Sequence, residues 1–138
     1  MLTLFVAACG DDDRLSTAEF VKQGNAICKA GEDKIEAAAA KAFPNQDERP
    51  DPATFKTLAN ETLIPSVKEQ LDGVDALKAP KDLQDAVDRM GSDGRAALDK
   101  MKADINNDTD AFLNSEIDPF AEVNEQAGEI GLTVCAEP

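Results

Sequence analysis

The sequence predicts an all-α protein, an antiparallel four-helix up-down bundle with an extended C-terminal tail. Apolar residues recur at spacings of three and four in four successive segments, the pattern of helices that bury one face. No alternation of apolar and polar residues typical of strands persists along the chain. The breaks between the segments are short, and short connections favour antiparallel neighbours. The length of 138 residues fits a single domain.

The first helix has the clearest start in the sequence. Ser16 and Glu19 stand at the N-cap and N3 positions of a capping box. Leu15 and Phe20 occupy the two positions of a hydrophobic staple. The apolar stripe that follows predicts a helix of roughly 27 residues. Its members are Phe20, Gly24, Ile27, Gly31, Ile35, Ala38 and Ala42.

The second helix is expected to begin at Pro52, with Asp51 as its N-cap. Pro65 lies inside the helical pattern, where it removes a backbone donor and clashes with the carbonyl of Glu61. We therefore expect a kink at this point rather than two separate helices. The apolar face consists of Phe55, Leu58, Thr62, Leu71, Val74 and Leu77.

The third helix is expected to start near Lys81 and to end before a loop at residues 104–110. Its stripe consists of Leu83, Val87, Met90, Gly94, Ala97 and Met101. A fourth helical segment is expected from about Asp110, with a bend or restart at Pro119. Its apolar face consists of Phe112, Phe120, Val123, Ala127 and Ile130. Gly131 followed by an apolar residue predicts a Schellman motif at the end of this segment.

The composition excludes several classes of function. Lys and Arg number 14 and Asp and Glu number 28, so the net charge of −14 leaves no basic footprint for nucleic acid. The chain has no His, which excludes Ser-His-Asp and Cys-His catalysis, imidazole metal ligands and the Glu-x-x-His motif of di-iron bundles. We therefore expect no enzymatic activity, no cofactor, no metal site and no nucleic-acid partner.

The N-terminal residues resemble the end of a bacterial lipoprotein signal. Residues 6–9, Val-Ala-Ala-Cys, match a lipobox, and an acidic stretch follows at once. This pattern makes residues 1–8 the remnant of a signal peptide and residues 9–15 an acidic tether lipidated at Cys9. No Lys or Arg precedes Arg14, so the signal is expected to begin upstream of Met1. The alternative is that residues 1–9 open a cytosolic domain.

Residues 16–138 then form a single helical domain that contains the other two cysteines, Cys28 and Cys135. In an oxidising compartment these two cysteines are expected to pair. The alternative is two unrelated buried thiols. The cysteine spacing contains no Cys-x-x-Cys motif.

The chain resembles a group of small actinobacterial lipoproteins of unknown function. The resemblance is carried by residues 25–28 (Asn-Ala-Ile-Cys), 118–120 (Asp-Pro-Phe) and 131–135 (Gly-Leu-Thr-Val-Cys), together with Phe20, Leu71, Leu77 and Pro80. It implies lipidation at Cys9 and a Cys28–Cys135 disulfide, and it implies no activity.

Such a bridge has a geometric consequence for the tail. The chain must reverse at Gly131, so that Leu132 and Val134 pack beside the first helix. The Cα atoms of Cys28 and Cys135 should then lie within about 7 Å.

Three further groups of residues suggest chemistry only weakly. Residues 104–110 resemble the start of a calcium loop, but the required Gly and Glu positions hold Thr109 and Ser115. The acidic run at residues 11–13 is expected to keep the tether solvated. Pairs of carboxylates, such as Glu32 with Glu36 and Asp82 with Asp85, are expected on wet faces, where they perform no acid–base catalysis.

Two functions of different class remain. The first is a membrane-anchored, non-enzymatic module on the extracytoplasmic face of the cell membrane, which binds or supports another envelope protein. The alternative is a binder or carrier of a small apolar ligand in a cavity between the helices. An exposed apolar patch would favour the first, and a cavity lined by Phe and Met the second. The candidate cavity residues are Phe20, Phe55, Met90, Met101, Phe112 and Phe120.

Overall fold

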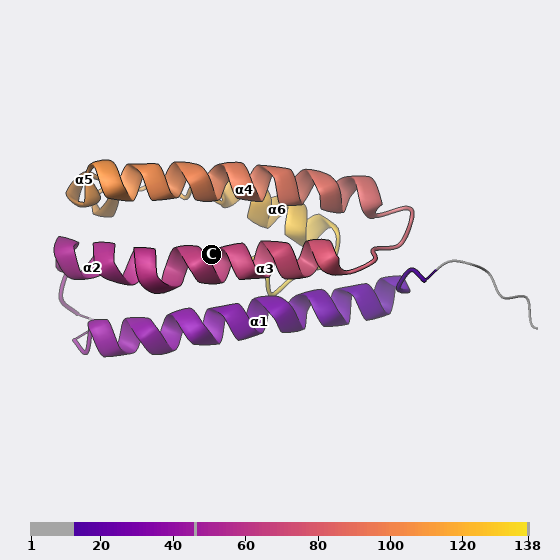
Figure 1. Cartoon of the computed structure of the whole chain (residues 1–138), viewed down its shortest axis with the longest axis horizontal. Coiled ribbons are helices and arrows are strands. Elements are labelled where there is room, and N and C mark those ends of the chain that lie inside the picture. The colour runs from indigo at the N-terminus through magenta and orange to yellow at the C-terminus, as the bar shows by residue number, and fades with distance from the viewer. Residues whose placement is uncertain (1–12, 46, 138) are drawn as a thin grey trace, which may run out of the picture.

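A computed structural model describes residues 13–45 and 47–137, and within these ranges every regular element is a helix. The elements are α1 (Thr17–Ala42), α2 (Pro52–Leu58), the π-helical turn η1 (Ala59–Leu63), α3 (Ile64–Ala76), α4 (Gln84–Asn107), α5 (Thr109–Leu113) and α6 (Ala121–Glu129). The all-helical class predicted from the sequence is confirmed. Three long rods run antiparallel, and the rod of α2, η1 and α3 packs between α1 and α4 (Figure 1).

Helix α1 starts where its capping signals predict. The Ser16 hydroxyl accepts a hydrogen bond from the Glu19 amide at 3.3 Å, and the Glu19 carboxylate accepts one from the Ser16 amide at 3.4 Å. Leu15 packs against the same apolar cluster as the buried Phe20, as the predicted staple requires. The Leu15 amide also donates to the Lys78 carbonyl at 2.9 Å, which ties the start of α1 to the end of α3.

The second rod passes through Pro65 without a break. Its start is confirmed, because the Asp51 carboxylate accepts hydrogen bonds from the amide and the hydroxyl of Thr54, both at 2.9 Å. One turn before Pro65 the helix widens, and the Ile64 amide donates to the carbonyl of Ala59, five residues earlier. The wide turn accommodates the proline ring that a regular helix would bring against the Glu61 carbonyl. A local π turn therefore stands where the sequence predicted a kink.

The expected loop at residues 104–110 is mostly helix. Helix α4 continues to Asn107, and Asp108 caps the short α5 by accepting a hydrogen bond from the Ala111 amide at 2.9 Å. Buried Ile105 extends the apolar stripe of α4 by one turn, while the polar side chains around it face solvent. The Asp and Asn content favours a loop, but Ile105 and Thr109 are both buried, and the Thr109 hydroxyl donates to the Ile105 carbonyl at 2.6 Å.

The fourth segment restarts near Pro119, as predicted, and forms two short helices. Residues 114–120 separate α5 from α6, and α6 has only nine residues. Asp118 organises the restart, because its carboxylate accepts a hydrogen bond from the Phe120 amide at 2.8 Å. Helix α6 therefore packs on α4 over only part of its length (Figure 1).

The chain reverses at Gly131 through the predicted Schellman motif. The Leu132 amide donates to the Ala127 carbonyl at 2.9 Å, and the Gly131 amide donates to the Gly128 carbonyl at 3.1 Å. Gly131 has a φ of 87°, a left-handed conformation that a side chain would strain. The tail beyond it was expected to be extended, but it folds into turns closed by hydrogen bonds such as Ala136 to Leu132 at 3.1 Å.

Two apolar clusters form the core. The first joins the start of α1, the end of α3, the start of α4, α6 and the tail, and its buried members include Phe20, Val74, Val87, Met90, Ala127 and Leu132. The second lies between the central rod and the far half of α4, and its buried members are Ala59, Ile64, Leu98, Met101 and Ile105. Phe120 packs against both clusters. No helix in the described ranges is long and apolar enough to cross a membrane.

Candidate functional site

An open cavity of about 640 Å³ lies between α1, the central rod and α6. Its floor is one face of η1 and α3, formed by Leu63, Val67, Gln70, Leu71 and Val74. One wall is a face of α1, formed by Cys28, Glu32, Ile35 and Glu36. The opposite wall combines Met90 of α4 with Asp118, Phe120, Val123, Asn124 and Ala127. Cys135 and Glu137 of the tail close one end.

The cavity exists because α6 is short. Helices of a bundle bury their facing stripes against one another, and a full-length fourth helix would cover the stripe of the central rod. Here α6 packs on α4 and shares an apolar cluster with Val74 at the end of α3, while Leu63, Val67 and Leu71 remain half-buried. These aliphatic side chains pack against the second cluster and also line an open, mostly apolar space.

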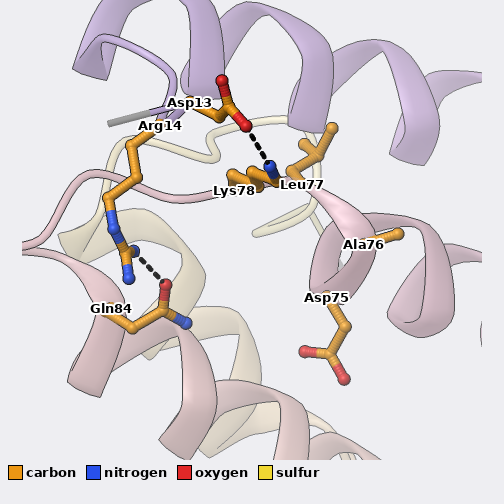
Figure 2. A pocket seen from close by; sticks show the side chains of 7 residues that line it. All are labelled: Asp13, Arg14, Asp75, Ala76, Leu77, Lys78 and Gln84. Carbon is orange, nitrogen blue, oxygen red and sulfur yellow. Dashed lines mark hydrogen bonds and ion pairs between the residues drawn. The ribbon is translucent and has the colours of Figure 1, made fainter. Parts of the chain in front are cut away.

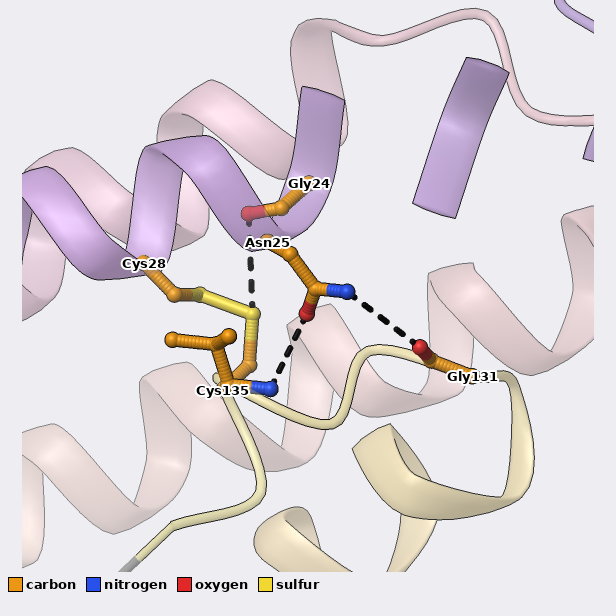
Figure 3. The surroundings of a disulfide bond; sticks show 6 residues. Gly24, Asn25, Cys28, Gly131 and Cys135 are labelled. Atoms are coloured by element: carbon orange, nitrogen blue, oxygen red, sulfur yellow. Dashed lines mark hydrogen bonds between the residues drawn. A yellow bond between two sulfur atoms is a disulfide. The ribbon is translucent and has the colours of Figure 1, made fainter. Parts of the chain in front are cut away.

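The tail is tied to α1 by a disulfide and by hydrogen bonds to Asn25, as Figure 3 shows. Cys28 and Cys135 form a disulfide with a Cα–Cα distance of 5.2 Å, so the predicted pairing is confirmed. Asn25 clamps the same stretch, because its side-chain oxygen accepts a hydrogen bond from the Val134 amide at 3.0 Å and its nitrogen donates to the Gly131 carbonyl at 3.5 Å.

Leu132 anchors the tail on α1, as the sequence predicted. The side chain is fully buried, and it lies directly over Gly24. A Cβ atom at Gly24 would stand 2.5 Å from a methyl carbon of Leu132, so only glycine lets the tail approach this closely. The reversal at Gly131 thus places both the disulfide and Leu132 against one face of α1.

Phe120 and Asp118 hold the mouth of the cavity on the α6 side. The Asp118 carboxylate accepts hydrogen bonds from the Phe120 amide and, at 3.5 Å, from the side-chain nitrogen of Asn124. These bonds hold the carboxylate at the backbone of Phe120, whose half-buried side chain lines the same cavity. An apolar wall and a fixed negative charge therefore stand next to each other.

Glu32 is the half-buried carboxyl of the α1 wall. Burial raises its pKa above the ordinary value of 4.5, and the neighbouring carboxylate of Glu137 raises it further. Lys29 opposes the rise, and Asp33 adds to it. The ionised form of Glu32 is thus disfavoured in the folded protein.

This pKa rise gives the stability a testable pH dependence. The folded protein holds the Glu32 proton more tightly than the unfolded chain, so stability falls as pH rises from about 4.5 through the folded-state pKa. The Glu32→Gln variant should therefore melt at a higher temperature than the wild type at pH 7, and the gain should disappear at pH 4. Circular dichroism melts at both pH values measure this. Glu36→Gln, which removes an exposed carboxylate from the same wall, is the control. An equal gain for Glu32→Gln at both pH values would contradict the explanation.

The structure brings two of the six candidate cavity residues to the cavity. Met90 and Phe120 line it, as predicted. Phe20 and Met101 are buried in the two core clusters. Phe55 and Phe112 pack against the second cluster and stack on each other with their ring centroids 6.0 Å apart. These four side chains are core residues.

The cavity residues predicted from the sequence did not include most of the floor, and they did not include the carboxylates on either wall. Leu63, Val67, Leu71 and Val74 repeat at helical spacing, which alone indicates a packed face. The sequence feature that indicates a cavity is the break at Asp118. This break shortens α6, the helix that would otherwise cover the face formed by these residues.

A second, polar depression of about 400 Å³ lies where the chain enters the domain (Figure 2). Lys78 forms an ion pair with Asp13 at 3.0 Å, and Arg14 donates to the Gln84 side chain at 2.7 Å and to the Ala79 carbonyl at 2.8 Å. These contacts hold the segment before α1 against the α3–α4 connection. The residues around this depression therefore have a structural role, and we call their contacts the clamp around Asp13 and Arg14.

The other candidate groups have structural roles where they are described. Asp104 pairs with Lys100 at 2.5 Å, Asp110 pairs with Arg49 at 2.7 Å, and Asp108 is a helix cap. Residues 13–45 and 47–137 contain no cluster of His, Cys, Asp or Glu that could hold a metal ion. Cys9 and most of the acidic run at residues 11–13 lie outside the described residues.

The fold and the cavity define a helical protein with one disulfide and a ligand-sized apolar site. Comparison of the chain with models of protein families, with curated proteins and with solved structures finds no match. The chemistry of the cavity is therefore the basis for a functional assignment.

Proposed function

We propose that this protein binds a small ligand with an apolar body in the cavity between α1, the central rod and α6. The cavity carries the proposal, because its volume of about 640 Å³ lies in the usual range of ligand sites. Its wall is mostly apolar, with the amides of Gln70 and Asn124 as neutral polar groups. Such a wall excludes water from an apolar body and leaves a few groups to orient it.

The proposed role is binding without catalysis. The chain has no His, and the two cysteines of the described domain are joined in a disulfide. The cavity therefore offers neither an imidazole base nor a thiolate nucleophile. The proposal includes no cofactor.

Small-ligand binding fits the surface better than the role of an envelope-protein docking module. A docking module needs a contiguous apolar patch. Ile117, at 78% exposure, is the one large apolar side chain that the described surface leaves exposed. The apolar residues that escape full burial instead gather around the cavity.

The proposed location is the extracytoplasmic face of the cell membrane, with the domain attached through lipid at Cys9, as in the actinobacterial lipoproteins that the sequence resembles. The clamp around Asp13 and Arg14 supports this, because it would fix the end of a tether to the domain. The disulfide supports an oxidising compartment. We propose that the architecture is a four-helix up-down bundle in which the short α6 occupies only part of the position of the fourth helix.

Ligand binding is tested by filling the cavity. Wild-type protein should enhance the fluorescence of the neutral apolar probe N-phenyl-1-naphthylamine. The double variant Ile35→Trp/Val67→Trp places two large rings on the α1 wall and the floor, so it should weaken probe binding at least tenfold. Ala86→Trp/Ala96→Trp adds the same rings at exposed positions of α4 and should bind like the wild type. Absence of wild-type binding, or equal binding by both double variants, would refute the proposal.

Anchoring is tested separately. With an upstream signal supplied in a host that lipidates such proteins, the wild type should fractionate with membranes and carry diacylglycerol on Cys9. Cys9→Ser should appear in the soluble fraction or remain unprocessed. Mass spectrometry of the N-terminal peptide reads the modification directly. Unmodified Cys9 in the mature wild type, with unchanged fractionation of Cys9→Ser, would contradict the lipid anchor.

A further inference from the structure

We infer that the ligand is an amphiphilic organic cation, whose apolar body fills the cavity while its protonated amine or quaternary ammonium group lies among the carboxylates of the rim. The inference rests on the proposed function and narrows its ligand class. It starts from the ionisable side chains that line the cavity, all of which are acidic.

Four carboxylates surround the apolar space from three parts of the chain. Glu32 and Glu36 stand one turn apart on the α1 wall, Asp118 stands on the opposite wall, and Glu137 comes from the tail. No Lys or Arg is among the lining residues. A cation at the mouth would therefore face negative charge on several sides.

The protein itself offsets the charge of these carboxylates only in part, through the electrostatic attraction of Lys29 to Glu32 and Glu36. Among the described residues, none of the four forms an ion pair with a Lys or Arg. Lys29, the cation that acts on Glu32, pairs instead with Asp33 on the outer side of α1. Glu32 and Glu137 are close enough to repel each other. A ligand cation would relieve this repulsion, whereas an anion would increase it.

The aromatic ring of Phe120 adds to the preference for a cation. It lines the cavity next to Asp118, whose carboxylate accepts the Phe120 amide proton at 2.8 Å. Asp118 and Phe120 therefore line the same cavity, and a carboxylate together with an aromatic side chain is a combination that suits a quaternary ammonium group. The net charge of −14 acts in the same direction at long range, by attracting cations and repelling anionic lipids and fatty acids.

The test compares three ligands that share a ten-carbon chain and differ in charge. Decyltrimethylammonium, 1-decanol and decanoate displace N-phenyl-1-naphthylamine from the wild-type protein, each below the concentration at which it forms micelles. The cation should displace the probe at a concentration at least tenfold lower than the alcohol, and decanoate should be the weakest. Added salt should weaken the binding of the cation and leave the binding of the alcohol unchanged.

Matched variants assign the preference to the cavity rim. Glu32→Gln/Glu36→Gln should weaken binding of the cation about tenfold and leave binding of 1-decanol unchanged, since each lost carboxylate removes one attractive charge from the rim. Glu122→Gln/Glu125→Gln removes the same net charge from exposed positions of α6 outside the cavity and should bind like the wild type.

The possible results distinguish a failure of this inference from a failure of the proposed function. If neither the probe nor any of the three ligands binds, the proposed function fails. If 1-decanol or decanoate binds as tightly as the cation, the cavity is a ligand site but the inference is wrong. The inference is also wrong if the rim variant and its control weaken the cation equally, because total charge would then explain the preference.

Discussion

Reduction of the Cys28–Cys135 disulfide should lower the free energy of unfolding by about 4–5 kcal/mol. The bridge spans 107 residues, nearly the whole domain, so its loss restores a large conformational freedom to the unfolded chain. Helicity should survive, because the capping box of α1 and the second apolar cluster contain no residue of the bridged tail. Urea unfolding followed by circular dichroism, with and without reductant, measures both effects.

The experiment is best done in a Cys9→Ser background, which leaves two cysteines and prevents thiol exchange. The Cys28→Ser/Cys135→Ser double variant should reproduce the effect without reductant. The Cys9→Ser protein in the absence of reductant is the matched control. A loss below about 1 kcal/mol, or two titratable thiols in the exported protein, would show that the tail does not act as a covalent clasp.

The local signals of this sequence predicted local structure well. Ser16 with Glu19, Asp51 with Pro52, and Gly131 with Leu132 each act through hydrogen bonds or steric limits within a few residues. Such signals operate in any surroundings, so they could be recognised from the sequence alone. The all-helical class followed from the same kind of pattern, repeated in four segments.

The features that build the cavity depend on packing between distant parts of the chain. Ile105 keeps the end of α4 helical because it is fully buried, a fact that its polar neighbours in the sequence conceal. The interruption at Asp118 shortens α6, and only in three dimensions does this leave Val67 without a covering helix. Periodicity places Phe20 and Phe120 on apolar faces alike, but it cannot tell a core side chain from a cavity wall.

The second large loss of stability is expected for Phe20→Ala, because Phe20 is a core side chain. Its ring is fully buried where α1, α3, α4 and the tail meet, among side chains such as Val87 and Leu132. Phe20→Ala should lower the free energy of unfolding by about 3–5 kcal/mol, since it loses the transfer energy of the ring and leaves a closed void. Urea unfolding with the disulfide intact measures the loss.

Phe120→Ala is the matched comparison, because it removes the same ring from a half-buried position that faces the cavity. Solvent already reaches this position, so the loss should be about 1–2 kcal/mol. Binding of N-phenyl-1-naphthylamine should respond in the opposite order, with a clear loss for Phe120→Ala and little change for Phe20→Ala under conditions where both variants stay folded. Equal stability losses for the two variants, together with equal probe affinities, would mean that Phe120 is an ordinary core residue. The cavity wall would then have to be reassigned to the aliphatic side chains of α3.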